Sequence, residues 1–192
     1  MRMTRSLLEE LVDVAVDQHG YVRTRDATAR GIDGANLRKM AARGRLEKVG
    51  RGLYRVPFLP RDEHDEYAEA VLWAEGRGII SHGSALALHQ LCDINPSRLH
   101  LTVPSTYTPR RTGGELYRVW RRRLDPGEVT TVDGIPVVTA ERAVRDGIAS
   151  GIDPQMLTQA ITTARREGLL TAAQATQLRR QLTAKLHRRN GR

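Results

Sequence analysis

Apolar and polar positions at the start of the chain alternate with the period of an amphipathic helix. The apolar residues between 7 and 15 recur at helical spacing after a Ser-x-x-Glu capping box at 6–9. Gly20 follows as a helix stop, and Tyr21-Val22-Arg23 has the composition of a short strand. The pattern therefore predicts one helix and one strand before residue 24.

Two further helices are predicted between residues 24 and 44. Thr24 is a candidate cap for a short helix at about 25–30, and Asp33 is a candidate cap for the next helix, which ends at Gly44. The second of these helices has an apolar inner face at i, i+3 and i+4 spacing, formed by Leu37, Met40 and Ala41.

A hairpin pattern follows these helices. Residues 45–49 and 53–56 have strand character and flank a loop that contains Gly50 and Gly52. The order helix, strand, helix, helix, hairpin is that of a winged helix-turn-helix, in which the hairpin is the wing. We expect residues 1–60 to form such a DNA-binding domain.

The remainder of the chain mixes helical and strand patterns after an acidic boundary at 61–66. We expect an α+β protein in which a mixed α/β C-terminal domain, residues 61–192, follows the winged helix and ends in helices. Strands are predicted at 79–80, 99–103, 115–121, 129–132 and 135–138. Helices are predicted at about 63–75, 82–91, 139–149 and 154–166, and after a capping box at 171–174.

The charge of the chain points to a polyanionic partner. The 31 Lys and Arg residues outnumber 22 acidic ones, which gives a net charge of +9 and a pI of about 10.5. A GC-rich genome, which encodes arginine-rich proteins, would account for some of this excess. However, the charge is clustered, with 12 basic and 7 acidic residues in 1–60 and 8 basic and 2 acidic residues in 151–192. Clustering favours a functional role.

Cysteine content and hydropathy indicate the compartment. Cys92 is the single cysteine, so no intramolecular disulfide can form, and a reducing environment is expected. The apolar runs fall short of the ~20 residues that a membrane-spanning helix needs. We therefore expect a cytoplasmic protein with no membrane contact.

Basic residues on the predicted third helix and wing are candidate DNA contacts. Asn36 and Arg38 suit base edges, because Asn can pair with adenine and Arg with guanine through two hydrogen bonds. Lys39 and Arg43 suit phosphates, as do Lys48 on the wing and Arg23 and Arg25 at the start of the second helix. Arg51, at the tip of the wing, suits either a minor groove or a phosphate. The simpler alternative is that these charges only solvate the surface.

Two more basic clusters lie beyond residue 100. The first surrounds a predicted hairpin with Gly113-Gly114 at its bend and is interleaved with Tyr117 and Trp120; it contains Arg110, Arg111, Arg118, Arg121, Arg122 and Arg123. We expect it to contact duplex phosphates, with single-stranded nucleic acid, an acidic protein or a solvated edge strand as alternatives. The second cluster lies on the last helix, at Arg179, Arg180, Lys185, Arg188 and Arg189.

Four stretches, taken in order, resemble the AbiEi-type antitoxins. They are Gly20-Tyr21-Val22-Arg23-Thr24 with Gly31-Ile32; Leu37-Arg38-Lys39-Met40 with residues 44–54; Ile80 to His89; and Leu99 to Pro104 with Val132 to Arg142. Gln90 and Ala143 depart from the pattern, and the segment after 150 has no counterpart in it.

This resemblance implies a function. Such antitoxins are encoded beside a nucleotidyltransferase-like toxin, and their winged helix represses their own promoter. Carried onto this chain, the DNA-reading positions are Asn36, Arg38, Lys39, Arg43, Lys48 and Arg51. We expect a sequence-specific DNA-binding antitoxin that counteracts such a toxin and self-associates on inverted repeats. A free-standing regulator without a toxin is the alternative.

Enzymatic sites are weakly indicated. His82, Ser84 and His89 lack a third metal ligand or an oriented base, and nothing in the sequence places Asp93 or His100 near them. The acidic residues Asp133, Glu141 and Asp146 lack the Glu-x-Lys partner of a nuclease. We expect no enzyme activity, no metal and no cofactor, with the histidines bonded to backbone and Asp133-Gly134 forming a turn.

Overall fold

The chain forms two compact units in the computed structural model, which describes residues 6–110 and 113–190 (side chains to 188). The first unit comprises Met1–Gly76 with Pro109–Gly114, and the second comprises Arg77–Thr108 with Glu115–Arg192. The boundary therefore falls later than the expected position after residue 60. Helix α4 (Asp65–Trp73) belongs to the first unit because Asp65 pairs with Arg55, and Glu69 accepts a hydrogen bond from Tyr21.

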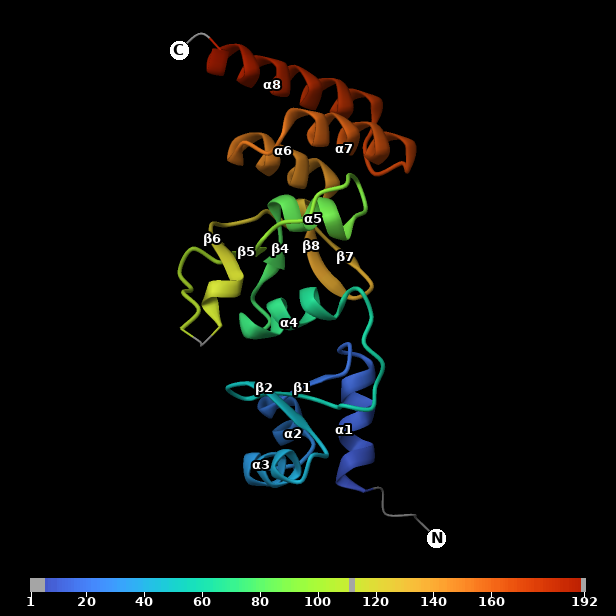
Figure 1. The fold of residues 1–192 in the computed structure, drawn as a ribbon, viewed down its shortest axis with the longest axis vertical. Coiled ribbons are helices and arrows are strands. Elements are labelled where there is room, and N and C mark those ends of the chain that lie inside the picture. The colour runs from blue at the N-terminus through green and yellow to red at the C-terminus, as the bar shows by residue number, and fades with distance from the viewer. Residues whose placement is uncertain (1–5, 111–112, 191–192) are drawn as a thin grey trace. The chain divides into compact units, whose positions relative to one another are not determined.

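Three helices of the first unit form where the sequence predicts, although α1 ends at Val16, before the expected stop near Gly20 (Figure 1). They are α1 (Leu7–Val16), α2 (Thr24–Ala29) and α3 (Gly34–Ala42). The capping box of α1 is confirmed, with Ser6 and Glu9 bonded to each other's backbone amides. Thr24 is not the cap of α2: it is the first helical residue, and Arg23 precedes it with Asp26 accepting from the Arg23 amide.

An antiparallel sheet completes the winged helix. Its strands are β1 (Tyr21–Arg23), β2 (Glu47–Gly50) and β3 (Leu53–Arg55), in the order β1-β3-β2. The register shifts between Lys48 and Gly50, so the alternation of β2 is irregular, as its sequence is. The predicted hairpin is confirmed, and β1 adds a third strand to it.

The core of the first unit lies between these helices and the sheet. It is formed by buried side chains from α1, β1, α2, α3 and β3 and from the adjoining loops, including Leu11, Val22, Ile32, Leu37 and Val56. Ala41 lies at its edge and is only partly buried. The helical spacing of apolar residues in α1 and α3 thus predicted the faces that are buried, except that Leu7, at the start of α1, is exposed.

A mixed sheet organises the second unit. Its strands are β4 (Ile79–Ile80), β5 (Leu99–Val103), β6 (Tyr117–Arg121), β7 (Val129–Val132) and β8 (Ile135–Val138), in the order β6-β5-β4-β8-β7. Strands β5 and β6 run parallel. The predicted hairpin around Gly113-Gly114 is therefore wrong, because neighbouring parallel strands cannot be joined by a tight turn. The Asp133-Gly134 turn between β7 and β8 is confirmed.

Helices cover this sheet and stack beyond it (Figure 1). They are α5 (His82–Leu88), α6 (Ala140–Ser150), α7 (Pro154–Arg166) and α8 (Ala172–Asn190), with short 3-10 turns at Gly114–Leu116 and Pro126–Glu128. Caps at Thr139, Asp153 and Thr171 bond the first turns of α6, α7 and α8, as predicted. No helix among the described residues is both long and apolar enough to cross a bilayer.

Candidate nucleic-acid interface

Helix α3 presents a basic outer face. Asp33 accepts a hydrogen bond from the Asn36 amide at 2.7 Å and so fixes the start of the helix. Leu37 and Met40 are buried, whereas Arg38 and Lys39 are exposed. Arg43, the residue that ends the helix, is also exposed, and Asn36 is half-buried near the first turn. The split between apolar and cationic faces is the one that a helix in a major groove requires.

The wing is docked onto the start of α2. The Thr24 amide donates to the Gly52 carbonyl at 2.9 Å, and Gly52 has a φ of +69°. The left-handed conformation favours glycine at this position, and a Cβ at Gly52 would lie 3.3 Å from Thr24 Oγ1, a tight contact that the Thr24 side chain would have to relieve. Lys48 and Arg51 are exposed on this hairpin. The contact therefore holds the basic wing and the helix-turn-helix in one arrangement.

Arg23 is less available than its sequence position suggests. Its guanidinium donates to both Asp26 oxygens, with Nε to Oδ2 at 2.7 Å and Nη2 to Oδ1 at 3.0 Å. Burial alone would raise the Asp26 pKa, but the hydrogen bond and positive charge of Arg23 lower it below its usual range. Arg25 stays exposed. The two arginines line a hollow of about 580 Å³ that also includes the acidic Glu75.

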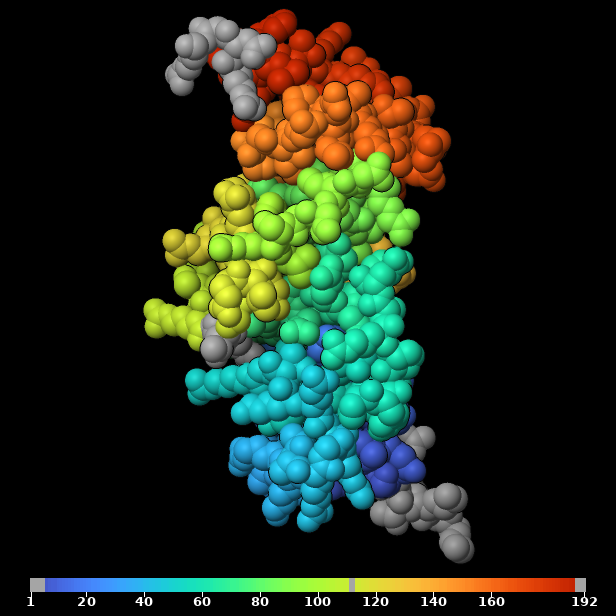
Figure 2. Space-filling view, viewed as in Figure 1, coloured from blue at the N-terminus to red at the C-terminus, as the bar shows by residue number. Residues whose placement is uncertain are grey.

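The structure thus brings six of the predicted DNA residues onto α3 and the hairpin of one unit. In the space-filling view, the light-blue and cyan atoms that include these two elements form a continuous face (Figure 2). The six are Asn36, Arg38, Lys39, Arg43, Lys48 and Arg51.

The predicted cluster at 110–123 is divided. Arg110 is exposed in the first unit, whereas Arg121 and Arg122 belong to the second. Arg121 donates to Thr108 at 3.2 Å, and Arg122 donates to the buried carboxylate of Asp146 at 2.8 Å. Arg111 lies outside the described residues. Because β5 and β6 run parallel, no hairpin gathers these arginines.

The last helix keeps part of its predicted basic surface. Arg179 and Arg180 line a shallow hollow of about 440 Å³ with Thr176, Thr183 and His187. Lys185 instead donates to the Ala149 carbonyl at 2.8 Å, which attaches α8 to the end of α6. Arg188 is exposed, and the side chain of Arg189 lies outside the described part of the chain.

Comparison with known proteins bears on the first unit. Residues 9–57 match the model of the family described as "Transcriptional regulator, AbiEi antitoxin". The resemblance in the sequence is therefore confirmed over the segment from α1 to just past β3. No curated protein matches the chain. Among solved structures, the crystal structure of the RV2827C protein from Mycobacterium tuberculosis aligns with 15% identity and a TM-score of 0.47, over 94% of this chain and 83% of that one.

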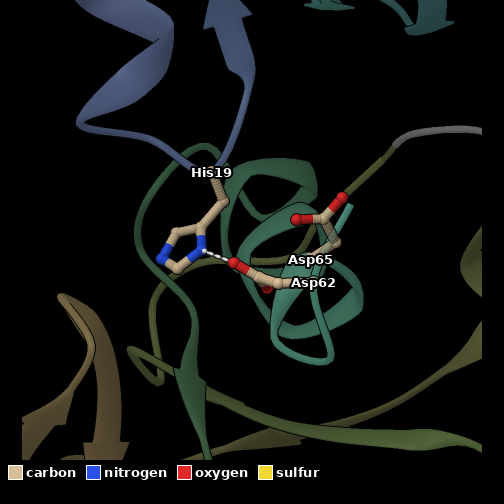
Figure 3. Close-up of side chains that lie close together, drawn as sticks. All are labelled: His19, Asp62 and Asp65. Carbon is tan, nitrogen blue, oxygen red and sulfur yellow. Dashed lines mark ion pairs between the residues drawn. The ribbon is translucent and has the colours of Figure 1, made fainter. Parts of the chain in front are cut away.

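An acidic corner next to the AbiEi-matched segment was missed by sequence reasoning. His19, Asp62 and Asp65 place three potential ligand atoms within 4.8 Å of one another (Figure 3). His19 Nδ1 lies 3.5 Å from Asp62 Oδ2. Asp65 is already paired with Arg55 at 3.2 Å, and the side chain of Asp62 is 57% exposed. The corner joins the α1–β1 turn to the start of α4 through these charges.

A second missed feature is a polar network in the second unit. His82 is buried, stacks on Trp120 with ring centroids 4.1 Å apart, and lies 5.6 Å from the His100 ring. Its Nδ1 is 3.0 Å from Ser81 Oγ, which also accepts from Thr102. Burial, with nearby positive groups, lowers the pKa of His82 to about 3.

The groups considered for catalysis are engaged in structural contacts. His89 Nε2 lies 2.8 Å from the Val138 carbonyl, as expected for a backbone-bonded histidine. The Ser84 hydroxyl accepts a hydrogen bond from the His100 backbone amide at 2.9 Å. Asp146 is bonded to Arg122 and Arg142. Glu141 accepts hydrogen bonds from Arg145 and Gln174. Cys92 is buried, which raises its pKa to about 11.

Proposed function

We propose that this chain is a regulator that binds double-stranded DNA through α3 and the β2–β3 hairpin. The observation that carries the proposal is the division of α3 into a buried face at Leu37 and Met40 and an exposed cationic face at Arg38 and Lys39. The match of residues 9–57 to a transcriptional regulator family supports the same reading.

Contacts on this surface divide by position. Asn36 and Arg38 lie in the first half of α3 and read base edges, because recognition helices enter the major groove by their N-terminal residues. Lys39, Arg43, Lys48 and Arg51 hold phosphates, with Arg25 as a further candidate. Arg23 is bonded to Asp26 and so stabilises the start of α2, and we do not assign it a DNA contact. Arg110, Arg121 and Arg122 are secondary candidates.

The second part of the proposal is that the chain acts as an antitoxin. The chain represses its own operon by binding inverted repeats in its promoter, with two copies on one operator, and it counteracts a nucleotidyltransferase-like toxin in the cytoplasm. Support comes from the family description matched by residues 9–57. A second unit larger than the winged helix offers surface for a toxin or for self-association.

Binding of the full chain to its own upstream promoter, against a scrambled duplex at two salt concentrations, tests the DNA-binding part. Specific and salt-sensitive binding supports it; equal weak binding to both duplexes contradicts it. Co-expression with the neighbouring gene product tests the antitoxin part. Promoter binding without rescue from a toxic neighbour would favour the free-standing regulator.

A further inference from the structure

We propose that the second unit binds a mononucleotide in a hollow between the strands. This hollow, here called the arginine pocket, includes Arg77, Arg122 and Arg123 in its lining. The proposal goes beyond DNA binding, because all of its described lining belongs to the second unit, whereas α3 and the wing belong to the first.

The size and lining of the arginine pocket suit a small phosphorylated ligand. Its volume is about 330 Å³, at the lower end of the range for ligand sites, roughly 300–1,000 Å³. No Asp or Glu is found among its described lining residues, although Arg122 pairs with Asp146, which is not one of them. The remaining lining residues are Ile79, Thr102, Val103, Pro104, Ser105, Leu124 and Val129.

Arg122 is held in place before any ligand arrives. Its Nη1 donates to Asp146 Oδ1 at 2.8 Å, and Asp146 is 2% exposed. Arg142 donates to the same oxygen through Nε at 2.9 Å and also pairs with Glu128 at 2.7 Å. A guanidinium has five N–H donors, so a bond from one nitrogen orients the group and leaves the other N–H donors able to bind a ligand. Such preorganisation lowers the entropic cost of binding a phosphate.

Arg77 and Arg123 supply the other two cations. The Arg77 guanidinium lies 4.7 Å from the centroid of the Tyr107 ring, an arrangement that restrains the group while its N–H bonds point outward in its own plane. Arg123 is exposed and follows Arg122 directly, at the end of β6. Phosphate oxygens are matched by guanidinium forks in two-bond geometry.

The apolar part of the wall selects a nucleotide over other anions. Ile79, Leu124 and Val129, which are partly exposed, give the hollow an apolar surface that a bare phosphate would leave unfilled. A base or ribose covers such a surface and gains from its burial. Duplex DNA presents its phosphates along an open ridge, which does not enter a hollow of this volume.

The test is calorimetric titration of the full chain with AMP, ATP, GTP and inorganic phosphate. We expect at least one nucleotide to bind with one-to-one stoichiometry, and inorganic phosphate to bind at least about tenfold more weakly. Arg123→Ala and Arg77→Ala should each weaken nucleotide binding by about tenfold or more, because each removes a charge-assisted contact. Arg166→Ala is the matched control, since Arg166 is exposed in the same unit and paired with Glu167.

Three results would overturn the proposal. One is the absence of nucleotide binding at millimolar concentration by a chain whose circular dichroism shows it to be folded. Another is phosphate binding as tight as nucleotide binding. The third is a loss of promoter binding, rather than nucleotide binding, in Arg77→Ala and Arg123→Ala. Arg38→Ala separates this site from the DNA surface, because it should impair promoter binding and leave nucleotide binding unchanged.

Discussion

Arg55 and Asp65 form an ion pair in the interior of the first unit, with Nη2 3.2 Å from Oδ2. The two residues are 2% and 6% exposed, and Arg55 also donates to the carbonyls of Val56, Leu59 and Pro60. Through these bonds the end of β3 holds the connecting segment and the first residue of α4. This explains why the first unit extends past the wing.

Asp65→Ala is expected to destabilise the first unit strongly. Removing the carboxylate leaves the Arg55 charge buried without its counterion, which costs about 3–5 kcal/mol in comparable pairs. Chemical denaturation of the full chain measures the loss. Glu66→Ala, at an exposed position on the same helix, should change stability by no more than about 0.5 kcal/mol. Equal effects of the two variants would show that the pair contributes nothing specific.

The double variant Arg55→Met/Asp65→Leu separates the pair from the packing. Asp65 Oδ1 and Arg55 Nε are buried and have no hydrogen-bond partner in the described part of the chain. The pair is therefore incompletely satisfied, and apolar replacements of similar volume should recover most of the stability lost in Asp65→Ala. Recovery of less than half would mean that the carbonyl bonds of Arg55 matter more than the ion pair.

Stability should fall as the pH drops below about 6.5, in part because of His82. Its pKa is lowered to about 3 in the folded chain, first by burial and then by His100 and Arg122. Above the unfolded pKa of about 6.5, both states hold a neutral ring. Between these two values only the unfolded state binds the proton, so unfolding is favoured, by about 2 kcal/mol from pH 7 to pH 5.

Denaturation midpoints at pH 7 and pH 5 check this dependence. His82→Asn should flatten the slope, and Asn tolerates the left-handed backbone at this position, where φ is +53°. His187→Gln, on an exposed position of α8, should keep the slope of the parent chain. Burial also lowers the pKa of His89 and of His100, so some slope should remain in His82→Asn. An unchanged slope in that variant would exclude His82 as a source.

Local signals in the sequence predicted most of the elements and failed for side chains brought together by the fold. Capping residues such as Ser6, Asp33 and Thr139 act on amides three residues away, so their roles are visible in a short window. His82 and Trp120 are distant in sequence, and only the pairing of β5 with β6 and the position of α5 bring their rings together. The arginine pocket arises in the same way, from segments that no spacing rule connects.

The wing should depend on glycine at position 52 more than at position 50. Gly52→Ala adds a strained left-handed residue, at about 1 kcal/mol, and a Cβ 3.3 Å from Thr24 Oγ1. Gly44→Ala carries similar strain at φ +70° but meets nothing within 4 Å, and Gly50→Ala meets nothing either. We expect promoter affinity to fall only in Gly52→Ala. Thermal denaturation beside DNA titration checks this, and equal affinity in all three variants would contradict docking of the wing on α2.

Variants of α3 and of the wing should weaken DNA binding in different ways. Arg38→Ala and Asn36→Ala remove base contacts, so promoter affinity should fall by about 1–3 kcal/mol while affinity for scrambled duplex changes little. Lys48→Ala and Arg51→Ala remove phosphate contacts, so affinity for both duplexes should fall and the salt slope should decrease by about one unit per residue.

Titrations of the two duplexes at several salt concentrations distinguish these outcomes, with Arg166→Ala as the control in the second unit. If the α3 variants and the wing variants behave alike, α3 binds phosphates and does not read base sequence. Parent-like behaviour in all four would move the DNA surface away from α3 and the wing. The difference between the pairs, rather than the loss in either one, therefore decides whether this helix reads sequence.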